Sequence, residues 1–352
     1  MADSSVNAKP FPLRAFAFIA TAVGFVAIAF ACTAGWLSPN RLTPQEMVTA
    51  LTQPRGPALG HRRNHAKGIC FTGTFEANGN GTMLSKAQVF EPGRYSVVGR
   101  FNIAGSDPHT PDPMAQVRGL GIRITTPDGQ ECRSAMIDAP VFAAPTPQAF
   151  FALLSASTSK DPNAFKEYSA EHPEILTFGA WAKSHPRTES WAEDRFNSLD
   201  SFAFINASGS IHVVRWSFVP SLRPVLLSPE DLAKRHSNFL AEDITRRVET
   251  GPSRWELLIT VANPGDPTAD PTKPWPADRR TVDVGTLIVK QIEPEADGPC
   301  RDINYDPAVL PPGITTSDDP FPAARSAAYR VSYDSRMDES QKYPRTRTGR
   351  KQ

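Results

Sequence analysis

The sequence predicts an α+β fold that is mainly β, an antiparallel barrel or sandwich with flanking helices, preceded by an N-terminal apolar segment. Strand-like runs recur without regularly alternating helices, which favours antiparallel over parallel sheets. Proline is abundant, and much of it clusters between apolar runs, as in ordered connecting loops. Residues 15–37 contain no charged residue. The prediction is therefore one β-rich domain behind a membrane-targeting segment.

The N-terminal segment fits two interpretations. An uncharged run of about 20 residues can span a bilayer as a helix, whereas a cleaved signal peptide has a shorter apolar core. Its length favours an uncleaved anchor, but Ala29 and Ala31 flank Phe30 as in a signal cleavage site. Lys9 and Arg14 keep the N-terminus in the cytoplasm by the positive-inside bias. We expect inner-membrane anchoring with the main domain in the periplasm, or a secreted or periplasmic protein if the segment is cleaved.

These features divide the chain into four parts. We expect a cytoplasmic tail over residues 1–14, an anchor or signal segment over 15–37, a main domain over 41–340 and a basic flexible tail over 341–352.

The main domain begins with a short helix, since Thr43, Pro44 and Glu46 form a helix-start pattern. Six strands are predicted from β-rich runs bounded by turn residues: 95–103, 117–125, 201–206, 212–219, 255–262 and 281–292. Residues 206–209 are typical of a hairpin connection between two of them. Helices are predicted over 228–249 and 319–336, and a proline-rich wrapping loop over 264–276.

Charge and cysteine content exclude some classes of protein. The net charge is +1 with both signs mixed along the chain, so no nucleic-acid-binding face is predicted. Cys70, Cys132 and Cys300 lie in the exported part, where an oxidising compartment permits one disulfide and leaves one free thiol. The spacing does not choose the pair. No cysteine or histidine spacing indicates zinc.

Two sequence motifs indicate what kind of chemistry the chain performs. Residues 60–68 read GHRRNHAKG, and this segment resembles the distal segment of haem catalases, with Arg62 three residues before His65. Residues 325–329 read RSAAY, which resembles the catalase proximal helix, where an arginine precedes the iron-ligating tyrosine by four residues. Several segments between them agree with the family, namely 98–105, 117–123, 139–142 and 264–276. The resemblance covers about residues 43–336 and is closest to the small catalase-related peroxidases.

The resemblance implies a catalase-like barrel that binds haem b, with Tyr329 as the axial iron ligand and His65 as the distal acid and base. It further implies that Arg62, Arg100 and Arg336 bind the haem propionates. Phe150, and less strongly Phe142, fit the segment that covers the haem face.

Elementary chemistry supports these residue types. Tyrosinate is a known haem ligand. Arg325 lies one helical turn before Tyr329, where its guanidinium can donate a hydrogen bond to the phenol oxygen. Tyr333, one turn further on, lacks an arginine at this spacing. His65 has a side chain suited to proton transfer near neutral pH. His61 and the remaining histidines are interpreted as surface or structural residues.

The chain departs from the catalase pattern on the distal side. Asn102 stands where catalases carry a serine, and Ile137 stands where an asparagine orients peroxide, with Asp138 as the neighbour that could contribute instead. We therefore treat Asn102 as a candidate catalytic residue. We also expect weak catalase activity and real peroxidase activity, with organic hydroperoxides preferred over hydrogen peroxide.

Two alternatives stay open. The chain could transform fatty-acid hydroperoxides as an allene oxide synthase-like enzyme, or serve as a non-catalytic haem carrier or sensor. The expected partners are a peroxide, an electron donor that the sequence does not identify and the membrane, and the expected state is a monomer or homodimer.

Overall fold

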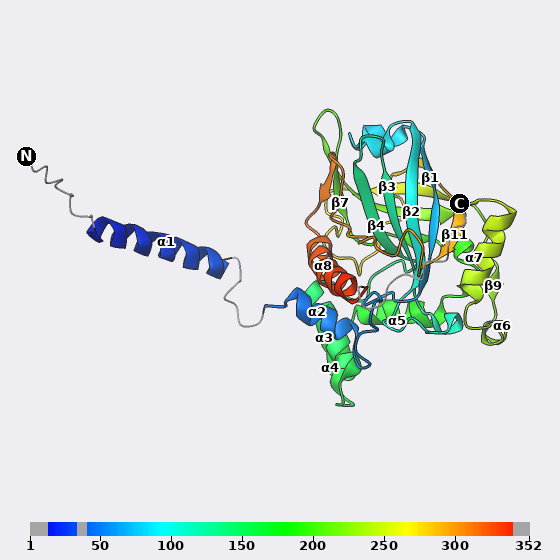
Figure 1. Ribbon diagram of the computed structural model, residues 1–352, viewed down its shortest axis with the longest axis horizontal. Coiled ribbons are helices and arrows are strands. Elements are labelled where there is room, and N and C mark those ends of the chain that lie inside the picture. Colours follow the sequence, from blue (N-terminus) through cyan, green and yellow to red (C-terminus); the bar gives the residue numbers. More distant parts are fainter. Residues whose placement is uncertain (1–12, 34–40, 341–352) are drawn as a thin grey trace, which may run out of the picture. The chain divides into compact units, whose positions relative to one another are not determined.

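The structure is a computed structural model that describes residues 13–33 and 41–340 (Figure 1). It divides into two compact units, residues 1–43 and 44–352. The predicted basic tail over 341–352 and most of the predicted tail over 1–14 lie outside the described residues.

The first unit contains α1 (Leu13–Thr33). Within it, residues 16–33 form the one helix among the described residues that is long and apolar enough to cross a membrane, and the unit buries none of this window. The Thr21 and Thr33 hydroxyls donate to the carbonyl oxygens of Ala17 and Ala29, at 2.8 and 3.0 Å. Such internal satisfaction of polar groups is what a helix in lipid requires.

The second unit is built on a closed antiparallel barrel of eight strands. Their order around the barrel is β10-β11-β1-β2-β3-β4-β6-β8, and β8 pairs back onto β10 to close it. Closure pairs every strand with two neighbours, although β4 and β6 pair at one position alone, Ile137 with Asn197. The strands are β1 (Gly68–Ala77), β2 (Gly93–Ile103), β3 (Arg118–Thr125), β4 (Glu131–Ile137), β6 (Phe196–Asn197), β8 (Ile211–Pro220), β10 (Ser253–Val261) and β11 (Thr281–Pro294).

Four shorter strands lie outside the barrel ring. β7 (Phe202–Ile205) pairs with β8 through the predicted hairpin, and β12 (Ile314–Thr316) adds to β7. β5 (Arg187–Thr188) and β9 (Leu226–Leu227) form a separate ribbon. All six predicted strands are present within two residues at each end, whereas the barrel strands β1, β4 and β6 and the short strands β5, β9 and β12 were not predicted.

The helices gather outside the barrel, and α2, α3, α4, α5 and α8 lie near one end of it (Figure 1). α2 packs against α8 and α3, and α3 packs against α4. Their bounds are α2 (Pro44–Leu51), α3 (Pro147–Thr158), α4 (Ala164–Glu171), α5 (Ile175–Ser184), α6 (Pro229–Ala233), α7 (Phe239–Thr250) and α8 (Phe321–Ser340). Single 3-10 turns occupy Asn80–Met83, Gln88–Phe90, Asp112–Met114 and Trp191–Glu193.

The single helix predicted over 228–249 is wrong, because the chain breaks between α6 and α7. Ser228 does cap the first piece, and its hydroxyl accepts the backbone N–H of Asp231 at 3.1 Å. The break comes at Ser237, whose carbonyl oxygen accepts from Lys67 Nζ at 2.6 Å and from the backbone N–H of Asp112 at 3.0 Å. These tertiary hydrogen bonds occupy the Ser237 carbonyl oxygen, which therefore does not accept a backbone N–H within a continuous helix.

Side-chain alternation along β2 separates the barrel core from the outer face. Val97, Phe101 and Ile103 point inward, where Phe101 lies at the centre of an aromatic cluster. Its ring centroid lies 4.7–6.2 Å from those of four other rings, Phe71, Trp191, Phe196 and Trp255. The alternate residues Arg100 and Asn102 therefore face outward, and yet both are buried. The segments that cover this outer face form the candidate site.

We predict that Phe101→Ala lowers the free energy of unfolding by about 3–5 kcal/mol, since it removes the central ring from a closed core. Urea unfolding followed by tryptophan fluorescence measures the change. Phe165→Ala is the matched control, because Phe165 on α4 is 48% exposed, and we expect a change within about 0.5 kcal/mol. A loss below about 1 kcal/mol for Phe101→Ala would contradict its central packing role.

Candidate active site

His65 lies in the loop that joins α2 to β1. Its backbone is left-handed, with φ at 54°, which is uncommon for a residue other than glycine. The Asn64 side chain supports this turn, because its Oδ1 accepts the backbone N–H groups of both His65 and Gly105 at 2.9 Å. The turn directs the imidazole toward the outer face of β2.

Asn102 fixes the orientation of the His65 ring. His65 Nδ1 lies 2.6 Å from Asn102 Oδ1, while Asn102 Nδ2 is directed to the carbonyl oxygen of Arg100 at 3.4 Å. This arrangement assigns the proton to Nδ1 and leaves Nε2 as an acceptor. Gly119 makes room for the pair, since a Cβ at this position would lie 2.3 Å from Asn102 Oδ1.

The electrostatic environment keeps His65 neutral. Burial, followed by the positive charge of Arg100, lowers the pKa of His65 to about 4, and Arg325 and Arg62 act in the same direction. The hydrogen bond to Asn102 only partly offsets these effects. The imidazole is therefore a free base at neutral pH, which suits a group that must accept a proton.

Tyr329 and Arg325 face each other on α8. Arg325 Nη2 donates to Tyr329 Oη at 3.0 Å and to the carbonyl oxygen of Ala135 at 2.8 Å, while Nη1 donates to Asp200 Oδ2. Burial acts to lower the pKa of Arg325, but the charges of Tyr329 and Asp200 outweigh it and raise the pKa above its usual value. Tyr333 has a different partner, since its ring lies 5.4 Å from the Arg336 guanidinium carbon.

Arg62, Arg100 and Arg336 form a cluster with Glu295, which follows β11. Arg100 pairs with the carboxylate in two bonds, Nε to Oε1 at 2.8 Å and Nη2 to Oε2 at 2.7 Å. Arg62 Nε lies 3.4 Å from Oε1. Arg336 is close enough for its charge to help lower the pKa of Glu295, after Arg100 and Arg62; burial acts in the opposite direction. The cluster carries three positive charges and one negative charge.

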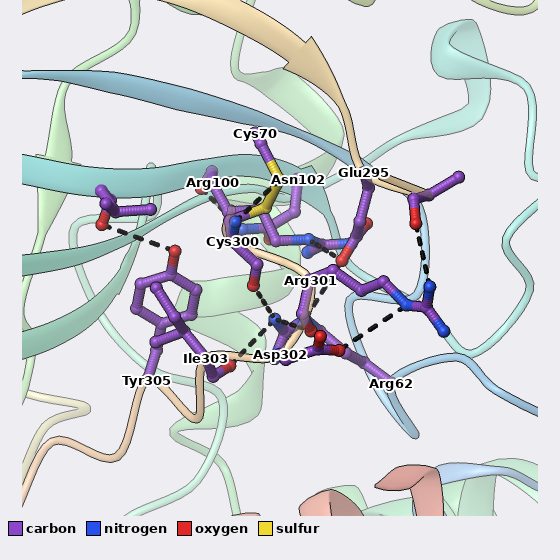
Figure 2. The surroundings of a disulfide bond; sticks show 12 residues. Arg62, Cys70, Arg100, Asn102, Glu295, Cys300, Arg301, Asp302, Ile303 and Tyr305 are labelled. Carbon is purple, nitrogen blue, oxygen red and sulfur yellow. Dashed lines mark hydrogen bonds and ion pairs between the residues drawn. A yellow bond between two sulfur atoms is a disulfide. The ribbon is translucent and has the colours of Figure 1, made fainter. Parts of the chain in front are cut away.

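The segment after Glu295 completes the cluster (Figure 2). Arg62 Nη2 donates to the carbonyl oxygens of Cys300 and Ile303 at 3.0 and 3.1 Å, and Arg336 donates to that of Arg301. A disulfide joins Cys300 to Cys70 on β1. The expected single disulfide is thus present, and Cys132 is the free thiol left over among the three cysteines after residue 37.

An ion pair links the two motifs that lie far apart in the sequence. Arg63 is buried and pairs with Glu339 on α8, whose carboxylate also accepts the backbone N–H of Gly60 at 2.7 Å. The loop that carries His65 is therefore attached to the helix that carries Tyr329.

The described contacts of the other predicted positions are with residues other than His65 and Tyr329. Phe150 on α3 packs against Phe142 with ring centroids 5.0 Å apart, and Phe142 contacts Phe321 at the start of α8. Ile137 ends β4, and Asp138 Oδ1 accepts the backbone N–H of Arg118 at 3.0 Å.

Sequence reasoning missed the acidic partners Asp200, Glu295 and Glu339. Each pairs with an arginine more than 100 residues away in the chain, so no local spacing signals the contact. A buried arginine needs a counter-charge, but that rule does not say which carboxylate supplies it. Among the described residues no group of three His, Cys, Asp or Glu side chains could hold a metal ion.

Comparisons with known proteins agree with this geometry. The catalase family profile matches residues 33–344. The chain is 33% identical to the catalase-related peroxidase of Synechococcus elongatus over 92% of this chain and 95% of that protein. It is 29% identical to the catalase-related peroxidase of Mycolicibacterium paratuberculosis, with 83% and 94% covered.

Among solved structures, catalase A from Saccharomyces cerevisiae is similar with a TM-score of 0.71 and 19% identity. The alignment covers 81% of this chain but only 63% of that catalase. The predicted catalase-like barrel fold is thereby confirmed.

We predict that Glu295→Gln lowers the free energy of unfolding at pH 7 by roughly 2–4 kcal/mol, because it removes the counter-charge of buried arginines. Burial acts to raise the pKa of Glu295, but the charges of Arg100 and Arg62 outweigh it, so the folded-state pKa lies below the usual value of a glutamate. A carboxyl with a lowered pKa stabilises the fold above its unfolded pKa, and this contribution is lost as the pH falls through the folded pKa.

The stability difference between wild type and Glu295→Gln should therefore shrink as the pH is lowered from 7 toward 3. Urea unfolding at several pH values measures it. Glu256→Gln, at an exposed position of β10, is the control and should change stability by less than about 0.5 kcal/mol. Equal stability of wild type and Glu295→Gln at pH 7 would contradict the role of the ion pairs.

Proposed function

The chain belongs to the catalase family, as a catalase-related peroxidase, and from this premise we propose that it is a haem-dependent peroxidase that reduces organic hydroperoxides and, less efficiently, hydrogen peroxide. The observation that carries the proposal is the 3.0 Å hydrogen bond from Arg325 to Tyr329 Oη. An arginine at this place stabilises a tyrosinate, and tyrosinate is a haem iron ligand.

The residues present fit a haem group. Tyr329 would ligate the iron, and Arg62, Arg100 and Arg336 would bind the propionates. With Glu295, the three guanidiniums leave two net positive charges, which match the two propionate carboxylates. Phe150 would contact the haem face. When bound, haem supplies the iron redox chemistry that peroxide reduction needs.

His65 would move the proton. It is neutral above a pH of about 4, because its pKa is lowered to that value by burial and by Arg100. Its Nε2 can accept the proton of a hydroperoxide and return it to the leaving oxygen, which departs as water or an alcohol. Asn102 holds the ring in the required tautomer through the 2.6 Å contact to Nδ1.

The distal departures from the catalase pattern support peroxidase over catalase activity. Oxidation of a second peroxide needs an orienting polar group where this chain carries Ile137. The neighbouring Asp138 already accepts the Arg118 backbone N–H and so is held by the end of β3. Cleavage of the first O–O bond relies mainly on His65.

The site would operate outside the cytoplasm. The apolar helix α1 supports a membrane anchor or an export signal, and the Cys70–Cys300 disulfide supports an oxidising compartment. We propose an inner-membrane-anchored protein with its haem domain in the periplasm, or a secreted or periplasmic form if the segment is cleaved, working as a monomer or homodimer with an electron donor.

Two assays on the haem-loaded protein test the function. We expect dye oxidation with an alkyl hydroperoxide and only slow oxygen evolution from hydrogen peroxide. Rapid oxygen evolution without dye oxidation would overturn the preference. Conversion of a fatty-acid hydroperoxide to an epoxide or aldehyde without a donor would support the allene oxide synthase-like alternative instead.

We predict that His65→Ala slows dye oxidation by about 10²–10⁴-fold while haem content stays unchanged, because the proton transfer is lost and the Tyr329 side is intact. His61→Ala is the matched control, since His61 is exposed in the same loop, and should stay within about twofold. Unchanged turnover in His65→Ala would favour a haem carrier or sensor.

A further inference from the structure

The segment Glu295–Ile303 lies across the outer face of β1 and β2 (Figure 2). The disulfide holds it there at a defined place. Cys70 pairs with Arg100 across the β1–β2 ladder and with Glu293 across the β1–β11 ladder, so the cross-link lies beside Arg100 and two residues along the chain from Glu295. Cys70 and Cys300 are both fully buried.

The cross-link fits tightly into its surroundings. The backbone N–H of Cys300 is directed to Cys70 Sγ at 3.2 Å. Gly298 allows this approach, because a Cβ there would lie 2.6 Å from Cys70 Sγ and 2.6 Å from the carbonyl oxygen of Pro294. A glycine at this position lets the chain fold back directly over the sulfur.

The same segment orients two arginines that come from other elements. Its carbonyl oxygens at Cys300, Arg301 and Ile303 accept from Arg62 of the distal loop and Arg336 of α8. We call these three acceptors the carbonyl cradle. None of the hydrogen bonds described for Arg62 or Arg100 uses Nη1, so this nitrogen of each side chain can serve a ligand.

The single negative charge of Glu295 does not balance the three guanidiniums of the cluster. Burial and the charge of Arg100 lower the pKa of Arg62, and burial and the charge of Arg62 lower the pKa of Arg336 to about 9. The three guanidiniums therefore repel one another at close range, and stationary acceptors are needed to hold their donor groups in one geometry.

We propose that the Cys70–Cys300 disulfide positions the carbonyl cradle, and through it the arginines that receive the two haem carboxylates. The inference rests on the proposed function, because it assumes that this cluster binds the propionates. It adds a dependence of cofactor retention on a covalent cross-link that lies outside the direct ligand contacts.

The test compares two porphyrins in the full-length chain. Wild type, Cys70→Ala/Cys300→Ala and Cys132→Ala are loaded with haem or with haem dimethyl ester, which lacks free carboxylates. Transfer of the porphyrin to excess apomyoglobin gives each release rate. The preference for free carboxylates is the ester release rate divided by the haem release rate.

We expect the double variant to release haem about 10-fold or more faster than wild type, as for other outer-sphere changes at cofactor sites. Release of the ester should change less, so the preference for free carboxylates falls. Cys132→Ala should leave both rates unchanged, since Cys132 is outside the disulfide. Circular dichroism verifies that each variant is folded.

Gly298→Ala provides a second variant if the double variant does not fold. It keeps both cysteines but displaces the cradle, and we expect the same fall in preference. Equal acceleration for both porphyrins would reveal general loosening and overturn the inference, as would unchanged haem release. A wild-type protein that retains no haem would instead overturn the proposed function, and the inference with it.

Discussion

Strand β2 places apolar side chains in the barrel core on one face and buried polar side chains on the other. The rest of the structure depends on how those polar side chains are paired. The inward side chains of β2 fill a closed barrel with rings around Phe101, while Arg100 and Asn102 on the other face carry polar contacts. Both outward residues are nevertheless buried, because the 60–66 loop and the segment after β11 cover them. A strand that is buried on both faces but polar on one needs hydrogen-bond partners for its polar side chains, and the partners of Arg100 and Asn102 define the site.

The partners come from distant parts of the chain because buried guanidiniums need counter-charges. Arg100 pairs with Glu295, Arg325 with Asp200, and Arg63 with Glu339. Each pair joins separate elements of the domain. The ion pairs therefore also attach the loops and α8 to the barrel. Removing either member would leave an uncompensated charge, which is far more costly than leaving out both. The ion pairs thus specify the relative placement of His65 and Tyr329.

Much of the fold was predictable because barrel strands carry local signals. Period-two alternation and flanking turn residues located six strands, but β1 escaped because two glycines and a bulge at Thr72–Gly73 interrupt its pattern. Helix α3 was not predicted, although Thr146 and Pro147 mark its start. The two motifs predicted the pairing of Arg325 with Tyr329, since both lie on one helix. The link from Asn102 to His65, and all three acidic partners, depend on tertiary contacts that no spacing encodes.

The two faces of β2 also separate stability from chemistry. Phe101 and Asn102 are neighbours in sequence, but one packs inside a closed ring of strands and the other orients an imidazole outside it. Apolar burial inside the barrel and polar contacts outside it therefore stabilise the domain through different residues of one strand. Because the two faces are separate, a substitution at Asn102 would alter the contact to His65 and leave the rings around Phe101 in place.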